Sequence, residues 1–379
     1  MSTERREVPL CRPSIGEAEI ERVVEVLRSG WLTHGEYNQK MERTFAEYIG
    51  VEHAVAMSSC TAALQVALLA NDIRGEVIVP TFTWVASANS VVTTGGTPVF
   101  CDVDGPTRNT TAELLAAHIT PRTEAVMPVH YGGQPCNMTE IVALCERHGL
   151  LLIEDSAETL GGSWRGVQAG AFGLGCFSFF PTKNITTGEG GMLTCKDQRT
   201  ADNVRALIAH GISSSTFARE KRSRPWLRAA TFAGYNFRMP NPLAALGYEQ
   251  MLRVDDFNTR RVALAKRYDD ALADLPQVRT PVVVDGATHA YQMYTVEVDA
   301  AIRDGVLAKL REQGVGASVH FAPVVHLQPL YAERGGRPGM FPVAERLAEE
   351  LITLPMFPDM SEDDQDWVID CLKRAVASA

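Results

Sequence analysis

Residues 176–194 read CFSFFPTKNITTGEGGMLT, and the interpretation of the whole chain depends on this stretch. It opens with an apolar run of strand length, presents Lys183 in a loop, turns through Gly-Glu-Gly-Gly at 188–191 and enters a second short strand. A lysine between two buried strands is partly desolvated, and desolvation favours the neutral amine, which is a nucleophile toward carbonyl groups. By itself the stretch fits two structures equally well: a loop with a reactive lysine, or a hairpin with a surface lysine at its tip.

The strand before this stretch favours the reactive lysine. Residues 150–155 form an apolar run that delivers Asp155 at its carboxyl end, 28 positions before Lys183. A Schiff-base lysine combined with an aspartate that pairs with a pyridinium nitrogen is the arrangement that pyridoxal 5'-phosphate (PLP) requires. Taken singly, Asp155 could also be a strand-end acid that caps the next helix.

Three motifs together resemble one enzyme group. The runs EDSAETLGG (154–162), FSFFPTKNITTGEGG (177–191) and GYNFRM (234–239) resemble the sugar aminotransferases of the DegT group, within the fold-type-I PLP enzymes. The resemblance extends from about residues 13–16 to the C-terminal helix. It implies a large domain with a mainly parallel, mixed, seven-stranded sheet and a smaller α+β C-terminal domain.

The resemblance also implies a set of cofactor-binding residues. Cys60 and Thr61, at the start of a helix, and the Ser178 hydroxyl would hold the cofactor phosphate, while Trp84 would stack on the ring. For each position an ordinary structural role remains open: a helix N-cap at 58–61 and a core aromatic at 84. Glu158 occupies a place beside the ring's phenolic oxygen where many relatives carry Gln or His, and it could also be a plain helix-start acid.

Asn236 of the GYNFRM motif implies a homodimer, because in the group this asparagine reaches the partner's cofactor phosphate. An asparagine that only caps the helix near 241 is the alternative. Two substrate residues are expected: Arg219, in a basic stretch suited to a diphosphate, and His320, in a pattern that relatives show near the sugar. A solvated basic loop and a structural histidine are the respective alternatives.

Composition excludes several other classes of protein. The chain has 379 residues and a net charge of −10, without the basic footprint of a nucleic-acid-binding protein. It lacks a Walker phosphate loop, G-x-G-x-x-G after a strand, G-x-S-x-G and H-E-x-x-H, and no metal site is expected. The eight cysteines show no paired spacing, the N-terminus does not look like a signal peptide and the most apolar stretch is interrupted by polar residues. We therefore expect a cytoplasmic protein with reduced thiols and no membrane span.

Alternating strand and helix patterns predict an α/β fold with a mainly parallel sheet. Strands are expected at 77–79, 99–103, 125–129, 150–155, 177–180, 192–194, 289–298 and 317–321. Helices are expected at 61–70, 84–93, 112–119, 138–148, 241–275, 305–313, 344–351 and 362–377. A further helix is expected to begin with a capping box at Ser14 and Glu17, to carry one apolar stripe (Ile20, Val23, Val24, Leu27) and to end at Gly30. The predicted division is an N-terminal arm (1–35), a large PLP-binding domain (36–250) and a small C-terminal domain (251–379).

Lys183 and Asp155 predict a PLP enzyme, and the resemblance implies an aminotransferase that moves an amino group from L-glutamate to a keto sugar carried by a nucleotide diphosphate. The cofactor would alternate with pyridoxamine 5'-phosphate, as in amino sugar and natural product biosynthesis. A glutamine-dependent aminotransferase of a cyclitol ketone (an inosose) is one alternative. A PLP-binding regulator without turnover is another. A sugar dehydratase is disfavoured, because dehydratases of this group typically replace the lysine with histidine.

Overall fold

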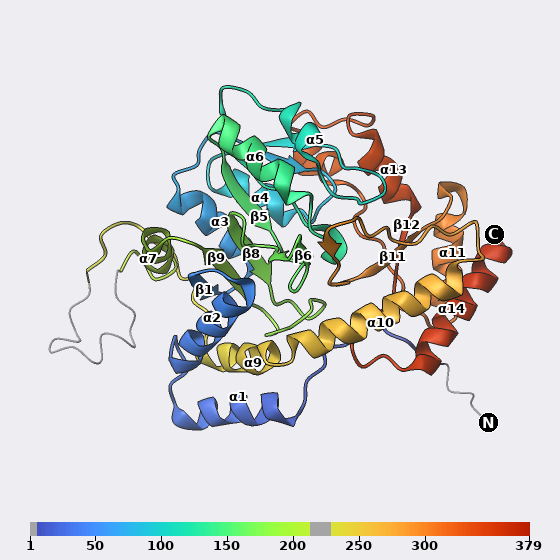
Figure 1. The fold of residues 1–379 in the computed structure, drawn as a ribbon, viewed down its shortest axis with the longest axis horizontal. Coiled ribbons are helices and arrows are strands. Elements are labelled where there is room, and N and C mark those ends of the chain that lie inside the picture. Colours follow the sequence, from blue (N-terminus) through green and yellow to red (C-terminus); the bar gives the residue numbers. More distant parts are fainter. Residues whose placement is uncertain (1–5, 213–228) are drawn as a thin grey trace.

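The computed structural model describes residues 6–212 and 229–379 (Figure 1). Its helices are α1 Glu17–Ser29, α2 Glu36–Ile49, α3 Cys60–Ala70, α4 Ala86–Thr93, α5 Ala112–Ala116, α6 Met138–His148, α7 Gln198–Leu207, α9 Asn241–Met251, α10 Val254–Leu272, α11 Ala300–Glu312, α12 Pro329–Ala332, α13 Pro342–Glu350 and α14 Glu362–Ala377. Its strands are β1 His53–Met57, β2 Glu76–Pro80, β3 Thr97–Cys101, β4 Thr123–Val126, β5 Leu151–Asp155, β6 Ser163–Trp164, β7 Val167–Gln168, β8 Leu174–Ser178, β9 Gly191–Cys195, β10 Ala287–Thr288, β11 Tyr294–Glu297 and β12 Leu351–Leu354.

A seven-stranded sheet with the order β1-β9-β8-β5-β4-β2-β3 forms the centre of the molecule. Neighbouring strands from β8 through β5, β4 and β2 to β3 are parallel, and β9 runs antiparallel to both β1 and β8. The expected α/β class and the mainly parallel, mixed, seven-stranded sheet are therefore confirmed. The two strands around the lysine loop, β8 and β9, pair as a hairpin, and β8 lies directly beside β5.

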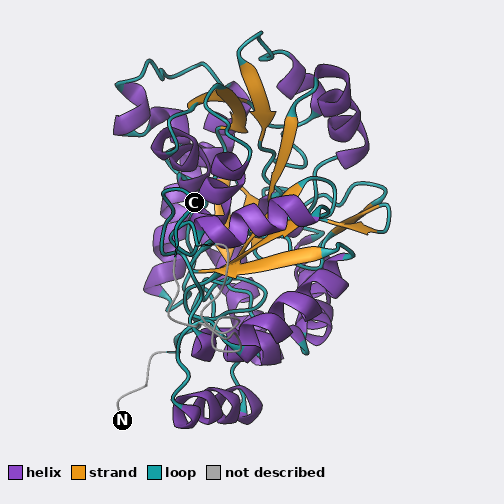
Figure 2. Cartoon of the chain, turned by 90° about the vertical axis from the view of Figure 1, so that its left-hand side faces the viewer, coloured by secondary structure: helices purple, strands orange, loops and turns teal. Residues whose placement is uncertain are grey.

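The side chains of the central strands alternate between two apolar layers, as the period of two for a strand requires. On β5, Ile153 packs with α3 and α7, whereas Leu152 packs with α6. On β8, Cys176 faces the α3 layer and Phe177 faces the α2 and α9 layer. Helices thus cover both faces of the sheet (Figure 2). By the same alternation, the residues two positions after Ile153 and Cys176 point to the α3 face.

A second apolar cluster surrounds a two-stranded antiparallel sheet of β11 and β12, covered by α10, α11 and α14. The predicted strand at 317–321 is wrong: it contributes only a single bridge from Ser318 to Thr353. The pairing strand is β12, which begins at the last residue of the predicted helix 344–351 and was not predicted. The run 351–354 is entirely buried, and a short buried apolar run cannot be assigned to helix or strand by periodicity alone. The predicted domain boundaries stay a prediction.

The N-terminal helix α1 differs from expectation in two ways. Its N-cap is Gly16, whose N–H donates to Glu19 Oε2 at 3.1 Å, so the capping interaction lies two residues later than predicted. The apolar stripe is also largely uncovered, with Ile20 46% and Leu27 53% exposed. The opposite side of α1 packs on α9 through polar contacts, including a hydrogen bond from Gln250 Nε2 to Glu19 Oε1 at 2.8 Å. The stripe is therefore turned away from α9, and α1 itself lies at the edge of the molecule (Figure 1).

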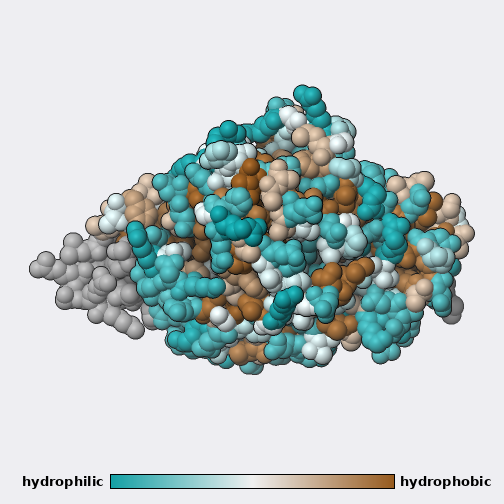
Figure 3. All heavy atoms as spheres, turned by 45° about the horizontal axis from the view of Figure 1, so that its top comes forward, coloured by the Kyte–Doolittle hydropathy of each residue, from teal (hydrophilic) through white to brown (hydrophobic). Residues whose placement is uncertain are grey.

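Hydrophilic residues dominate the molecular face in Figure 3, with apolar groups between them. In the part of the chain that the structure describes, every helix is too short or too polar to cross a bilayer.

Candidate active site

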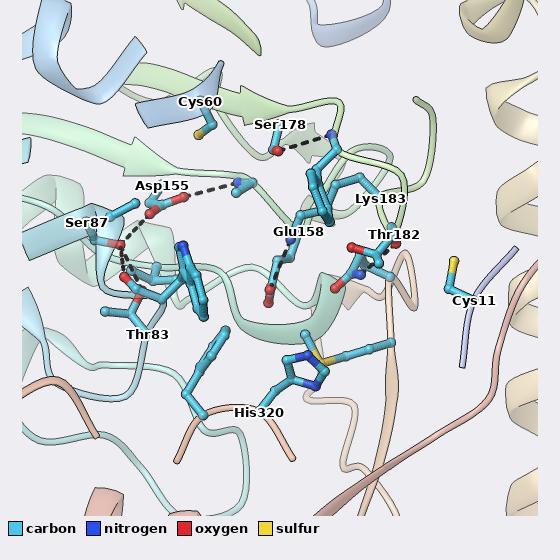
Figure 4. Close-up of a pocket in the computed structure, with 18 of the residues that line it drawn as sticks. Cys11, Cys60, Thr83, Ser87, Asp155, Glu158, Ser178, Thr182, Lys183 and His320 are labelled. Atoms are coloured by element: carbon cyan, nitrogen blue, oxygen red, sulfur yellow. Dashed lines mark hydrogen bonds and ion pairs between the residues drawn. The ribbon is translucent and has the colours of Figure 1, made fainter. Parts of the chain in front are cut away.

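A cavity of about 460 Å³ opens beyond the carboxyl ends of β5 and β8 (Figure 4). Ligands of open α/β sheets bind at such strand ends. Most of the residues expected at the site line this one cavity: Cys60, Thr61, Trp84, Asp155, Glu158, Ser178, Lys183 and His320. Its volume lies in the range of small-molecule sites.

Strand alternation explains why Asp155 and Ser178 share the cavity. Asp155 lies two residues after Ile153, and Ser178 lies two residues after Cys176, so both point to the α3 face of the sheet. Glu154 points to the other face, where its carboxylate accepts hydrogen bonds from the Gly170 and Phe172 N–H groups at 2.8 Å. The Glu-Asp pair thus divides into one structural carboxylate and one carboxylate available to a ligand.

The Asp155 carboxylate is buried and held at both oxygens. Oδ2 accepts a hydrogen bond from Ser87 Oγ at 2.7 Å, and Oδ1 accepts one from the Ala157 N–H at 3.2 Å. Burial raises the pKa of Asp155, while these two donors and the nearby Lys183 act to lower it. A buried carboxylate with room beside it is suited to a protonated ring nitrogen.

Lys183 follows β8 in a turn that is fixed on both sides. Its N–H donates to the Phe180 carbonyl at 2.9 Å, and Gln292 Nε2 donates to the adjacent Thr182 carbonyl at 2.8 Å. The side-chain amine lies 3.3 Å from Glu158 Oε1, and the other oxygen of Glu158 accepts the Gly132 N–H at 2.9 Å. Glu158 is therefore the ionic partner of the lysine in this structure, a pairing that the sequence did not suggest.

The start of α3 lies against the end of the lysine hairpin. A Cβ on Gly191 would meet the Ser59 carbonyl carbon at 2.3 Å and the Cys60 nitrogen at 2.5 Å, so only glycine allows β9 to pass this closely. Ser59 Oγ caps the helix by accepting the Ala62 N–H at 3.1 Å. The first-turn amides of Cys60 and Thr61 precede the first helical hydrogen bond, and such a turn is an anion site.

Aromatic side chains form the mouth of the cavity. Trp84 lies just before α4 and is 63% exposed, with its ring 6.3 Å from that of Phe321. His320 Nδ1 lies 2.9 Å from Thr353 Oγ1, and burial lowers the pKa of His320, which favours the neutral ring. The indole and the imidazole, each beside the Phe321 ring, present a stacking surface and a hydrogen-bonding ring to a ligand.

Two expected residues, Asn236 and Arg219, remain to be accounted for, and only Asn236 is among the described residues. Asn236 is exposed, in a segment that rests on the end of α7 through a bridge to Ala209, and it does not line the cavity of its own chain. Arg219 lies outside the described residues. His326, by contrast with His320, is fully buried between Thr81 and Glu345 at 2.7 and 3.2 Å, as a structural histidine would be.

Several lining residues were not anticipated from the sequence: Leu10, Cys11, Thr83, Ser87, Gln292, Met293, Thr353 and Met356. Ser87 carried a weak signal, as a serine in the apolar helical run 84–93 that follows a strand. Thr83, next to Trp84, carried none of its own, and the others come from segments distant in the chain and carried none either.

The described residues fit a bound PLP. Four features converge on one cavity: the lysine amine, a buried carboxylate with donors on both oxygens, the N-terminus of α3 and an exposed indole. The strand β9 can lie against that N-terminus because residue 191 is glycine. The four features correspond to the aldehyde, ring nitrogen, phosphate and ring face of this cofactor. Within residues 6–212 and 229–379, no cluster of three or more histidine, cysteine or acidic side chains could hold a metal ion.

Comparison with known proteins agrees with this geometry. A profile of the DegT/DnrJ/EryC1/StrS aminotransferase family matches residues 13–373. The spore coat polysaccharide biosynthesis protein SpsC of Bacillus subtilis is 40% identical, over 98% of each chain.

Two solved structures share the fold closely. The aminotransferase TlmJ from Streptoalloteichus hindustanus has a TM-score of 0.91 and 35% identity, covering 98% of this chain and 99% of its own. Helicobacter pylori PseC, an aminotransferase involved in the biosynthesis of pseudoaminic acid, has a TM-score of 0.91 and 26% identity, covering 99% and 100%. The fold is that of the fold-type-I PLP aminotransferases. The chain belongs to the DegT/DnrJ/EryC1/StrS aminotransferase family.

Proposed function

We propose that this aminotransferase moves an amino group from L-glutamate to a keto sugar carried by a nucleotide diphosphate, with PLP as its cofactor. The observation that carries the proposal is the convergence of Lys183 and Asp155, from the ends of neighbouring strands, on one cavity. The family is one of sugar aminotransferases, and the relatives SpsC and PseC take their names from polysaccharide and pseudoaminic acid biosynthesis. These names support a sugar acceptor.

In this proposal each side chain has one task. PLP supplies an electron sink that makes a Cα–H bond acidic. Lys183 would hold the cofactor through its amine, and the free amine would move the proton of the substrate as base and then as acid. Asp155 keeps the ring nitrogen protonated. With the keto sugar bound, Lys183 carries the proton in the opposite direction.

The remaining site residues bind and shield. Cys60, Thr61 and Ser178 surround the position proposed for the phosphate, and burial raises the pKa of Cys60 well above its usual range, so this group adds no negative charge there. Trp84 would cover the ring and exclude water. Glu158, 3.3 Å from the Lys183 amine, would help to hold that amine in position.

Completion of the site requires a second copy of the chain. Asn236 is exposed and lies off the cavity of its own chain, as expected if it serves the partner's cofactor phosphate. The outward stripe of α1, with Ile20 and Leu27, and the exposed Tyr235 beside Asn236 offer apolar surface for a homodimer. We further propose a cytoplasmic location, since the eight free cysteines suit a reducing compartment.

The test of the activity is a pair of half-reactions with purified protein. Bound PLP is followed by its visible absorption as L-glutamate converts it to the pyridoxamine form, and single keto sugars on nucleotide diphosphates are then added to reverse the change. Conversion by glutamate and reversal by a nucleotide-linked ketose are the expected results. Reversal by an inosose, with glutamine as donor, would replace the proposal with the cyclitol enzyme. Bound PLP that no amino acid converts would indicate a regulator instead.

The shared site is tested by subunit complementation. Neither Asn236→Ala nor Lys183→Ala alone should give an active dimer, but mixed dimers contain one site with both residues intact. Partial recovery of activity on mixing is expected. Verified mixed dimers without any recovery would contradict a site shared between chains.

A further inference from the structure

The carboxylate of Asp155 is bound by a hydroxyl that the proposed function leaves without a task. Ser87 Oγ lies 2.7 Å from Asp155 Oδ2, and Thr83 Oγ1 lies 2.8 Å from Ser87 Oγ (Figure 4). All three side chains are buried, and Ser87 is completely so. A buried hydroxyl chain that ends on a carboxylate has a defined direction, because each hydroxyl has a single proton to donate.

The direction follows from counting donors and acceptors. An ionised Asp155 only accepts, so the Ser87 proton goes to Oδ2, where a charge-assisted hydrogen bond is stronger than one to the Trp84 carbonyl 3.1 Å away. The Ser87 oxygen is then an acceptor, and Thr83 donates to it. The result is a relay from Thr83 through Ser87 to Asp155, in which every proton has a partner.

The position of Ser87 is fixed by the surroundings of α4. Asn89 Oδ1 on this helix accepts a hydrogen bond from the Tyr331 hydroxyl at 2.7 Å, and Thr93 Oγ1 accepts one from Gln65 Nε2 at 2.8 Å. Ser87 lies in the first turn, on the side that faces β5. A side chain on a rigid, anchored helix keeps its position and orientation more precisely than one on a loop.

The relay opposes the effect of burial on Asp155. Burial raises the pKa of this carboxyl, and the Ser87 hydrogen bond is the largest influence that lowers it, followed by the Ala157 N–H. Without the hydroxyl, the buried carboxyl would more readily keep its own proton. A protonated Asp155 cannot form an ion pair with a ring N–H.

We propose that Ser87 is a positioning residue that holds Asp155 ionised and aimed at the cofactor ring nitrogen, with Thr83 as the donor to Ser87. The inference rests on the proposed function, since it requires PLP in this cavity. Wild-type protein should bind PLP more tightly than an analogue without the ring nitrogen, because the ring nitrogen pairs with Asp155. A variant without the Ser87 hydroxyl should lose this difference in affinity.

The experiment compares two cofactors on the apo form of the full-length protein. One is PLP, and the other is its carba analogue, in which a C–H replaces the ring nitrogen. The measured quantity is the ratio of the two dissociation constants. In Ser87→Ala this ratio should move toward one by about tenfold, because the loss of one hydrogen bond to a charged group changes a dissociation constant by about that factor. Ser90→Ala is the matched control, because Ser90 is equally buried on α4 but donates only to the Ser87 carbonyl, at 2.7 Å.

The outcomes separate the relay from general disruption. A ratio unchanged in Ser87→Ala, or moved equally in Ser90→Ala, would overturn the inference while leaving the proposed function intact. Wild-type protein that binds neither compound would overturn both. Thr83→Val keeps the shape of the side chain and should move the ratio by about threefold, as a weaker, neutral hydrogen bond would. If Ser87→Ala does not fold, an unchanged ratio in Thr83→Val decides against the relay.

Discussion

The cavity has two walls that differ in how the chain builds them. The sheet wall consists of strand ends, helix starts and the lysine hairpin: Cys60, Thr61, Trp84, Ser87, Asp155, Glu158, Ser178 and Lys183. The opposite wall consists of an N-terminal segment and segments near β11 and β12: Leu10, Cys11, Gln292, Met293, His320, Phe321, Thr353, Leu354 and Met356. The residues proposed to act on the cofactor lie on the sheet wall. The residues of the opposite wall shape the cavity and its opening.

The difference lies in what holds each wall. On the sheet wall, strand register and helix caps place the side chains, so local sequence determines their direction. On the opposite wall the fixed points are long-range bonds. Arg261 of α10 is 1% exposed, and its Nη1 donates to the carbonyls of Tyr291, Gln292 and Met356 at 3.2, 3.0 and 3.4 Å. Substitutions on the first wall should therefore affect chemistry, and substitutions on the second should affect stability or acceptor binding.

The largest effect is expected for Lys183→Ala on the sheet wall. Without the amine, neither half-reaction has its proton carrier, so turnover should fall below detection, and borohydride should trap no cofactor on the protein. Absorption and mass spectrometry measure both. Lys196→Ala, an exposed lysine just after β9, should behave as wild type. Substantial turnover in Lys183→Ala would remove the lysine from the mechanism.

The next effect is expected for Arg261→Met behind the opposite wall. Three buried carbonyl groups would lose a donor, and the free energy of unfolding should fall by about 3 kcal/mol. Urea unfolding followed by circular dichroism measures the change. Arg260→Met on the same helix removes only solvent-exposed ion pairs to Asp256 and Asp359 and should cost less than about 1 kcal/mol. Equal losses in the two variants would contradict the bracing role of Arg261.

A smaller and more selective effect is expected for His320→Ala. If the ring contacts the sugar, the KM of the keto acceptor should rise by about tenfold, as for one lost hydrogen bond, while the glutamate half-reaction keeps its rate. Steady-state and single-turnover kinetics separate the two. His148→Ala, on the exposed end of α6, is the control. A loss confined to the glutamate half-reaction would place His320 on the donor instead.

The smallest effect is a pH dependence of stability due to His289. Burial, together with the charge of Arg108, lowers the pKa of His289 to about 3, and its Nδ1 accepts the Tyr291 N–H at 2.9 Å. In the unfolded chain this imidazole gains a proton near pH 6.5, whereas in the folded chain it stays neutral until a much lower pH. The free energy of unfolding therefore falls as the pH decreases. Between pH 7 and 5.5 the loss from this group should be about 1 kcal/mol.

His289→Gln should remove this part of the pH dependence. Urea unfolding at pH 7 and 5.5, compared between the two proteins, isolates the contribution of His289, because the other histidines are common to both. Identical pH slopes for variant and wild type would show that the imidazole gains its proton in the folded chain.

Much of the sheet wall was predictable because its signals are local. An apolar run that ends in Asp155, a lysine between two strand-like runs and a Ser-Ser-Cys-Thr helix start each define a position within a few residues. The strand and helix pattern then brings them to one edge of the sheet. Glu158 was expected at the site, but its ion pair with Lys183 depends on how the loop after β5 folds back, which no local pattern encodes.

The sequence alone was enough for the α/β class, the lysine and aspartate, and the resemblance to sugar aminotransferases, since periodicity and short motifs report on neighbours along the chain. Only the tertiary structure could show that β12 pairs with β11, that the stripe of α1 faces outward, that Ser87 bonds to Asp155 and that Arg261 braces the far wall. The physical reason is that these contacts join segments separated by tens to hundreds of residues. Packing and hydrogen-bond satisfaction select such partners, and no pattern within either segment specifies the other.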